Sequence, residues 1–121
     1  MNPIRIAIAD DHPMIIGGLE NILSRYPHII LTGTYNNGNS LLDGLKQDGE
    51  PDVLLLDIQL PDITGDELTP LILKKHPGVR ILILTNFDSA LYVNNMLRRG
   101  VHGYLLKTSE KEVLIQAIET V

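Results

Sequence analysis

Short apolar runs alternate with amphipathic segments along the whole chain. The apolar runs are rich in β-branched and aliphatic residues, which is typical of strands. They occupy residues 4–9, 28–35, 53–57, 79–85 and 103–106. The amphipathic segments repeat apolar side chains at helical spacing. They occupy residues 13–26, 40–45, 65–76, 89–99 and 109–121.

This alternation predicts an α/β fold with one parallel sheet, right-handed crossovers and helices on both faces of the sheet. For five strands we expect the flavodoxin-like order 2-1-3-4-5. The run at 53–57 is apolar without interruption until its last residue, which indicates a central strand buried on both faces. The run at 28–35 is more polar, which places it nearer an edge.

Local signals set the expected limits of the helices. Residues 40–43 and 109–112 resemble capping boxes, so we expect helices to begin there. Gly100 suits the position just after a helix that ends at Arg99. Pro70 conflicts with the interior of the helix predicted at 65–76, so this helix either starts late or is kinked.

Polar residues stand at the ends of four predicted strands. They are Asp10 and Asp11, Asp57, Thr85 and Lys107. Because the carboxyl ends of parallel strands share one edge, where ligands collect in open α/β sheets, these side chains are expected to lie together. Taken singly, each has an ordinary alternative as a helix cap, a turn residue or a solvated charge. Their convergence on one edge favours a common site.

Carboxylates crowded at one edge favour phosphoryl chemistry. Their mutual repulsion raises pKa values unless a cation is present. Hard oxygen ligands that stay open to water and phosphate are typical of a Mg²⁺ site. With Mg²⁺ bound, Asp57 remains ionised and can attack phosphorus, while Lys107 and Thr85 bind the phosphoryl oxygens.

Composition and charge limit the partners and the compartment that we expect for this protein. The absence of cysteine excludes a disulfide scaffold and any thiolate site. With 15 acidic and 10 basic residues the chain carries a formal charge of −5, so it has no electrostatic footprint for nucleic acid. No apolar run approaches the roughly 18 residues of a membrane span, and no signal peptide is recognised. We expect a cytoplasmic protein without membrane contact, and we assign no chemistry to its scattered histidines.

The order of the strand-end residues resembles the receiver domain of bacterial two-component response regulators, over essentially the whole chain, 1–121. Three segments are similar to the NarL/FixJ (LuxR-type) class, namely 10–13, 56–62 and 103–107. The resemblance implies a CheY-like fold in which Asp57 accepts a phosphoryl group from a sensor histidine kinase. It also implies that Mg²⁺ is held by Asp10, Asp11, Asp57 and the backbone carbonyl of Gln59.

The resemblance further implies a switch. Lys107 would pair with the phosphoryl group, Thr85 would close on it, and Tyr104 would turn inward. A homodimer would form on phosphorylation, and DNA would be bound only through a C-terminal helix-turn-helix domain that this chain lacks. Self-phosphorylation from a donor and autodephosphorylation, both dependent on Mg²⁺, would be its only reactions, so it would not be an enzyme in the usual sense.

The sequence departs from the common pattern of this family near the site. Asn86, where a small residue is common, and Phe87 flank the phosphoryl site together with Gln59, which bears on the lifetime of the phosphoryl group. Thr108 stands where a proline with a cis bond is common, and a cis bond before a non-proline residue costs about 3 kcal/mol. We therefore expect no cis bond there.

Other functions fit parts of the pattern. A stand-alone receiver that signals by protein contact is the main alternative to a regulator of transcription. A phosphatase with an aspartyl nucleophile is disfavoured because the chain has no cap domain. A nucleotide-binding flavodoxin-like module would need a Gly-rich phosphate loop after the first strand, where this sequence has none.

Overall fold

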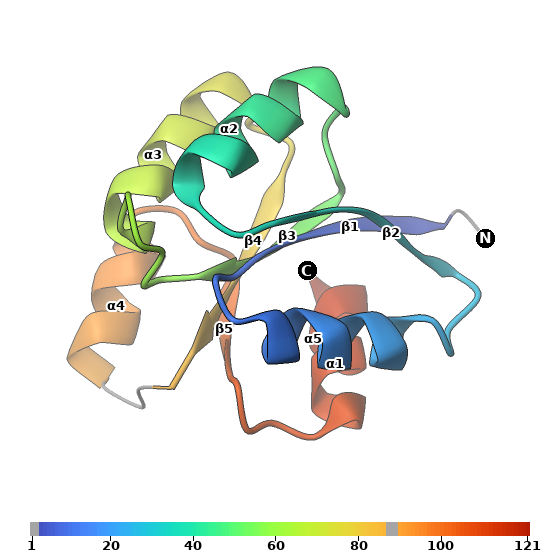
Figure 1. Cartoon of the computed structure of the whole chain (residues 1–121). Coiled ribbons are helices and arrows are strands. Elements are labelled where there is room, and N and C mark those ends of the chain that lie inside the picture. Colours follow the sequence, from blue (N-terminus) through green and yellow to red (C-terminus); the bar gives the residue numbers. More distant parts are fainter. Residues whose placement is uncertain (1–2, 87–89) are drawn as a thin grey trace.

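A computed structural model describes residues 3–86 and 90–121, in which a sheet is covered by helices on both faces (Figure 1). The elements are, in chain order, β1 Ile4–Ala9, α1 Pro13–Leu23, β2 Ile29–Tyr35, α2 Gly38–Gln47, β3 Val53–Asp57, α3 Gly65–Lys75, β4 Arg80–Thr85, α4 Ala90–Arg98, β5 Gly103–Leu106 and α5 Lys111–Thr120. Neighbouring strands are parallel, and the 5-stranded sheet has the order β2-β1-β3-β4-β5. The predicted topology is confirmed, with the more polar β2 at an edge.

β3 is the central strand, and all of its residues are buried. Because successive side chains of a strand point to opposite faces, Leu54 and Leu56 enter one apolar cluster while Val53 and Leu55 enter the other. Buried residues of α2, α3 and α4 complete the first cluster, and those of α1 and α5 complete the second. Figure 1 shows α1 and α5 on the face opposite α2 and α3. Asp57 is therefore the last residue of a strand that is enclosed on both faces.

Two helices begin at caps other than those expected. α2 starts at Gly38 because the side chain of Asn37 accepts a hydrogen bond from the Ser40 N–H at 2.7 Å. Asn37 thus takes the capping role that was predicted for residues 40–43. α5 starts at Lys111 after Glu110, whose side chain makes no capping hydrogen bond. The capping box predicted at 109–112 is wrong, since the Ser109 N–H bonds to the Leu106 carbonyl at 2.9 Å and remains in the preceding turn.

Pro70 lies inside α3, which begins at Gly65, so the expectation of a late start is wrong. A proline at this position has no N–H to donate to the carbonyl of Asp66, four residues earlier. Arg99 follows α4, and its Nη1 donates to that carbonyl at 3.3 Å. A side chain distant in sequence therefore supplies a donor where the helix lacks one.

The turn after α4 matches its prediction. Gly100 has a φ of 107°, a conformation that glycine adopts without strain. Its N–H bonds to Leu97, and the Val101 N–H reaches back to Met96. These two bonds form the Schellman motif that commonly ends a helix.

In the part of the chain that the structure describes, no helix has both the length and the apolar character that a membrane span requires.

Gly65 closes the loop that leaves β3. Its N–H donates to the Ile58 carbonyl at 2.9 Å, and Gln59 forms an isolated antiparallel bridge with Thr64. A Cβ atom at position 65 would lie 2.9 Å from the Ile58 Cα, a backbone atom that cannot rotate away. The path of the chain after Asp57 therefore depends on a residue without a side chain.

We predict that Gly65→Ala lowers the free energy of unfolding by about 1–3 kcal/mol, the usual cost of overpacking. Gly17→Ala in α1 is the matched control, because a Cβ there meets nothing within 4 Å. It should raise the free energy of unfolding by up to about 1 kcal/mol, since alanine favours helices. Urea denaturation measures both, and a Gly65→Ala variant as stable as Gly17→Ala would contradict the steric explanation.

Candidate functional site

One ammonium group lies between two buried carboxylates at the carboxyl edge of the sheet. Asp10 follows β1, Asp57 ends the neighbouring β3, and Lys107 follows β5. Lys107 Nζ lies 3.0 Å from Asp10 Oδ2 and 3.2 Å from Asp57 Oδ2. The exposed fractions of the three side chains are 6% for Lys107, 0% for Asp10 and 4% for Asp57. The structure therefore brings together three of the residues that the sequence places at strand ends.

The charge of Asp57 is only partly compensated. Burial raises the pKa of its carboxyl group above the ordinary value, and the nearby charge of Asp10 adds to this. The Gln59 N–H, 3.1 Å from Oδ1, and the ammonium group of Lys107 lower the pKa of Asp57, but burial prevails. An additional cation at this position would favour the ionised form.

Asp11 and His12 complete a cluster with Asp10 and Asp57. Asp11, which is more exposed, brings a carboxylate oxygen to the same place as Asp10 and Asp57, and His12 brings a ring nitrogen. One ligand atom from each of the four lies within 4.8 Å of the others. Asp10 Oδ2 is buried and has no hydrogen bond among the described residues, although Lys107 is at ion-pair distance. This donor set is able to bind a metal ion.

His12 is the member of the cluster that sequence reasoning missed. Its Nδ1 lies 2.8 Å from Asp10 Oδ1 and 3.1 Å from Asp11 Oδ1. Its backbone N–H also bonds to Asp10 Oδ1 at 2.8 Å. The available signal was its position directly after the two aspartates, between β1 and α1. Of the other histidines, His28 lies beside Glu119 and His76 beside Glu50, while His102 Nδ1 accepts the Ile81 N–H at 3.1 Å.

Two other predicted residues lie on β4 and β5. Thr85 is buried at the end of β4, and its carbonyl accepts the Lys107 N–H at 2.8 Å. Tyr104 on β5 is 42% exposed, so in this structure its side chain is outward. Asp57 pairs in register with Leu84, which places Thr85 one residue beyond it on the adjacent strand.

The flanking residues are placed only in part. Gln59 and Asn86 are exposed beside the site, whereas Phe87 lies outside the described residues. The metal-binding role of the Gln59 carbonyl stays a prediction. Within residues 3–86 and 90–121 there is no cis peptide bond, which agrees with the expectation for the bond between Lys107 and Thr108.

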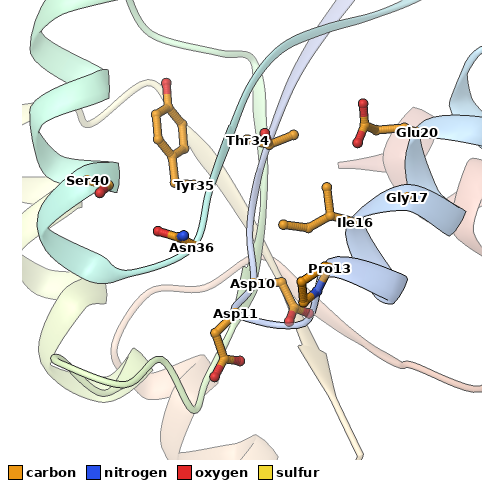
Figure 2. A pocket seen from close by; sticks show the side chains of 10 residues that line it. All are labelled: Asp10, Asp11, Pro13, Ile16, Gly17, Glu20, Thr34, Tyr35, Asn36 and Ser40. Carbon is orange, nitrogen blue, oxygen red and sulfur yellow. The ribbon is translucent and has the colours of Figure 1, made fainter.

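An open pocket of about 440 Å³ adjoins the cluster. Figure 2 shows Asp10 and Asp11 at one end of it, with residues of α1 on one side and Tyr35, Asn36 and Ser40 on the other. Asp57 and Lys107 do not line this pocket. The acidic pair therefore faces an open space that small ions can enter.

We predict opposite pH dependences for two Asp→Asn variants. Because the folded-state pKa of Asp57 is raised, its ionisation costs stability as the pH rises through that pKa. Asp57→Asn should therefore be more stable than the parent at pH 7, and the difference should disappear below the ordinary carboxyl range near about 3.9.

Asp62 provides the matched comparison. Its carboxylate accepts the N–H groups of Gly38 at 2.7 Å and Asn39 at 2.9 Å at the start of α2, which lowers its pKa. Its stabilisation is present above the ordinary carboxyl range and is lost as the pH falls through the folded pKa. Asp62→Asn should thus be less stable at pH 7. Thermal unfolding between pH 3 and pH 7 tests the pair, and parallel profiles would contradict it.

Comparison with known proteins finds a matching family and similar sequences. The sequence matches the family described as response regulator receiver domain over residues 6–119. It is 34% identical over 120 residues to the transcriptional regulatory protein DegU of Brevibacillus brevis, which is 99% of this chain and 50% of DegU. It is 34% identical over 116 residues to the nitrate/nitrite response regulator NarL of Escherichia coli K12, covering 96% of this chain and 53% of NarL. The chain thus spans about half the length of these relatives.

The fold has close counterparts among solved structures. The crystal structure of the non-phosphorylated receiver domain of the stress response regulator RcsB from Escherichia coli matches with a TM-score of 0.91 at 25% sequence identity. The match covers 98% of this chain and 92% of that one. It bears out the predicted sheet order and the arrangement of the helices.

Proposed function

This chain belongs to the response regulator receiver domain family, and we propose that Asp57 is its phosphoacceptor. The observation that carries the proposal is the contact of 3.2 Å between Asp57 Oδ2 and Lys107 Nζ at the end of the central strand. A buried carboxylate with a fixed ammonium beside it has a partner ready for a transferred phosphoryl group. The adjoining acidic cluster supplies ligands for a divalent cation.

The reaction we propose is a direct transfer to Asp57. One carboxylate oxygen attacks the phosphorus of a phosphohistidine on a sensor kinase, or of a small acyl phosphate. The O–P bond to Asp57 forms while the bond from phosphorus to the donor breaks, and the donor leaves with the electron pair. Lys107 stabilises the negative charge on the phosphoryl oxygens, the part of the transition state that most needs stabilisation.

The residues that would hold Mg²⁺ are Asp10, Asp11, Asp57 and the carbonyl of Gln59. Their hard oxygen atoms fit this ion, and the buried Asp10 Oδ2 without a hydrogen bond among the described residues offers one such atom. When bound, Mg²⁺ would neutralise the carboxylates and offset the charge of an incoming phosphoryl group. Lys107 already offsets part of the negative charge of Asp10 and Asp57.

The proposed switch uses Thr85 and Tyr104. Thr85 pairs in register with Leu106, and Tyr104 lies two residues before Leu106, so Thr85 and Tyr104 belong to the same face of the sheet. A phosphoryl group adds roughly two negative charges beside Asp57 at neutral pH. Thr85 then moves toward the phosphoryl oxygens, and Tyr104 turns into the space that it leaves. Phosphorylation biases two states rather than creating a new one.

The proposed output is regulation of transcription. DegU and NarL are each about twice as long as this chain and are regulators by name. We propose that a sensor histidine kinase phosphorylates the chain in the cytoplasm, that the phosphorylated form dimerises, and that a C-terminal domain outside this chain binds DNA. The site performs self-phosphorylation and autodephosphorylation, and Gln59 and Asn86, together with Phe87 next in the sequence, set the lifetime of the phosphoryl group.

The decisive test of phosphorylation is intact mass and peptide mapping after incubation with Mg²⁺ and acetyl phosphate. We expect one phosphoryl group, on Asp57, and none when Mg²⁺ is removed by a chelator. Asp57→Asn should take up no phosphoryl group. Asp52→Asn, an exposed position just before the same strand, should behave like the parent. An adduct that persists in Asp57→Asn would refute the assignment.

A second prediction concerns the switch. Tyr104→Ala should weaken dimerisation of the phosphorylated protein by at least about tenfold, equivalent to about 1.4 kcal/mol, because the inward position of the ring is lost. Sedimentation equilibrium with and without acetyl phosphate measures this. Leu71→Ala on α3 is the control, since Leu71 is 48% exposed and Tyr104 is 42% exposed. Unchanged dimerisation in Tyr104→Ala would rule out the inward turn.

A further inference from the structure

The ring of His12 lies against all three carboxylates of the site. Its Nδ1 is 2.8 Å from Asp10 Oδ1, 3.1 Å from Asp11 Oδ1 and 3.8 Å from Asp57 Oδ2. This nitrogen takes no part in the proposed phosphoryl transfer. It is the only ligand atom of the described cluster that is not an oxygen.

These separations suit ligands of a single first-row transition-metal ion. Oxygen and nitrogen atoms bound at about 2.0–2.2 Å from one metal ion lie about 3 Å from one another. The distances from Nδ1 to Asp10 and Asp11 already have this value, and the distance to Asp57 exceeds it by less than 1 Å. Nδ1 is hydrogen-bonded to Asp10 Oδ1, and Lys107 Nζ lies 3.4 Å from Nδ1. Side-chain movements that include the ammonium group of Lys107 would therefore complete such a site.

The backbone holds the ring in this place. His12 is the residue before α1, with Pro13 as the first residue of the helix. Its N–H bonds to Asp10 Oδ1 at 2.8 Å, so the main chain is fixed to the cluster as well. Asp10 Oδ2 is wholly buried and makes no hydrogen bond in the described part of the chain, and its ion-pair partner there is Lys107 Nζ at 3.0 Å, so a metal ion would supply further positive charge to this oxygen.

We propose that His12 is an additional metal ligand, so that this site binds Zn²⁺ and Mn²⁺ through one imidazole nitrogen as well as Mg²⁺ through oxygen. The inference rests on the proposed function only in placing a cation among the same carboxylates. Imidazole favours transition metals, whereas carboxylates and water suit Mg²⁺. The nitrogen thus alters the choice of ion without removing any oxygen ligand. Zn²⁺ would then compete with Mg²⁺ for this site.

The test measures metal binding directly, with Zn²⁺ and Mg²⁺ titrated separately into the whole chain by calorimetry. Loss of partners that only orient a ligand costs about 10–100-fold in metal affinity, so loss of a direct ligand should cost at least about tenfold. We expect His12→Ala to weaken Zn²⁺ binding by that factor and to change Mg²⁺ binding by less than about twofold. His12→Asn should do the same while it keeps a favoured helix N-cap, which separates ligation from folding.

His28→Asn is the matched control, since His28 pairs with Glu119 at 2.8 Å, away from the cluster. It should bind Zn²⁺ as tightly as the parent. Electron spin echo spectra of the Mn²⁺-loaded protein should show nitrogen coupling in the parent and none in His12→Ala. Equal Zn²⁺ affinities of parent and His12→Ala, or the absence of nitrogen coupling, would overturn the inference. Failure of the parent to bind Mg²⁺ would instead count against the proposed function.

Discussion

The contact of Lys107 with Asp10 and Asp57 is the interaction on which the organisation of the sheet edge depends. Buried carboxylates are costly unless they are paired, and here one ammonium group pairs with two of them. The main chain of Lys107 is fixed as well, because its N–H bonds to the Thr85 carbonyl at 2.8 Å. The ends of β1, β3, β4 and β5 are thereby joined through one residue.

This pairing leaves the site incompletely neutralised. Burial still raises the pKa of Asp57, and Asp10 Oδ2 has only the ion pair with Lys107 among the described residues. Proteins commonly keep such costs at functional sites, where a ligand later removes them. The fold makes this possible, since β3 is enclosed by apolar clusters on both faces. In the proposed switch, a new charge at Asp57 would act on Lys107, which lies 3.2 Å away, and on Thr85 of the adjacent strand.

Much of this could be predicted from sequence because it depends on periodicity. The apolar runs predict the strands, and their parallel order brings Asp57 and Lys107 to one edge. The contacts of His12 could not be predicted, since they depend on the direction in which the turn after β1 presents the ring. The start of α2 was missed because Asn37 and Ser40 are both good caps, and only the fold selects between them. Pro70 lies inside α3, where Arg99 donates to the Asp66 carbonyl that has no N–H partner at position 70, and no local pattern indicates this contact.

The most direct test is an NMR titration of the Asp57 side-chain carboxyl carbon, in the absence and in the presence of Mg²⁺. Without the ion, the pKa of Asp57 should lie above the ordinary carboxyl value of about 3.9. Addition of Mg²⁺ should lower it, because a cation among Asp10, Asp11 and Asp57 favours the ionised form. An ordinary pKa that does not respond to Mg²⁺ would contradict a cation-dependent phosphoacceptor at this edge of the sheet.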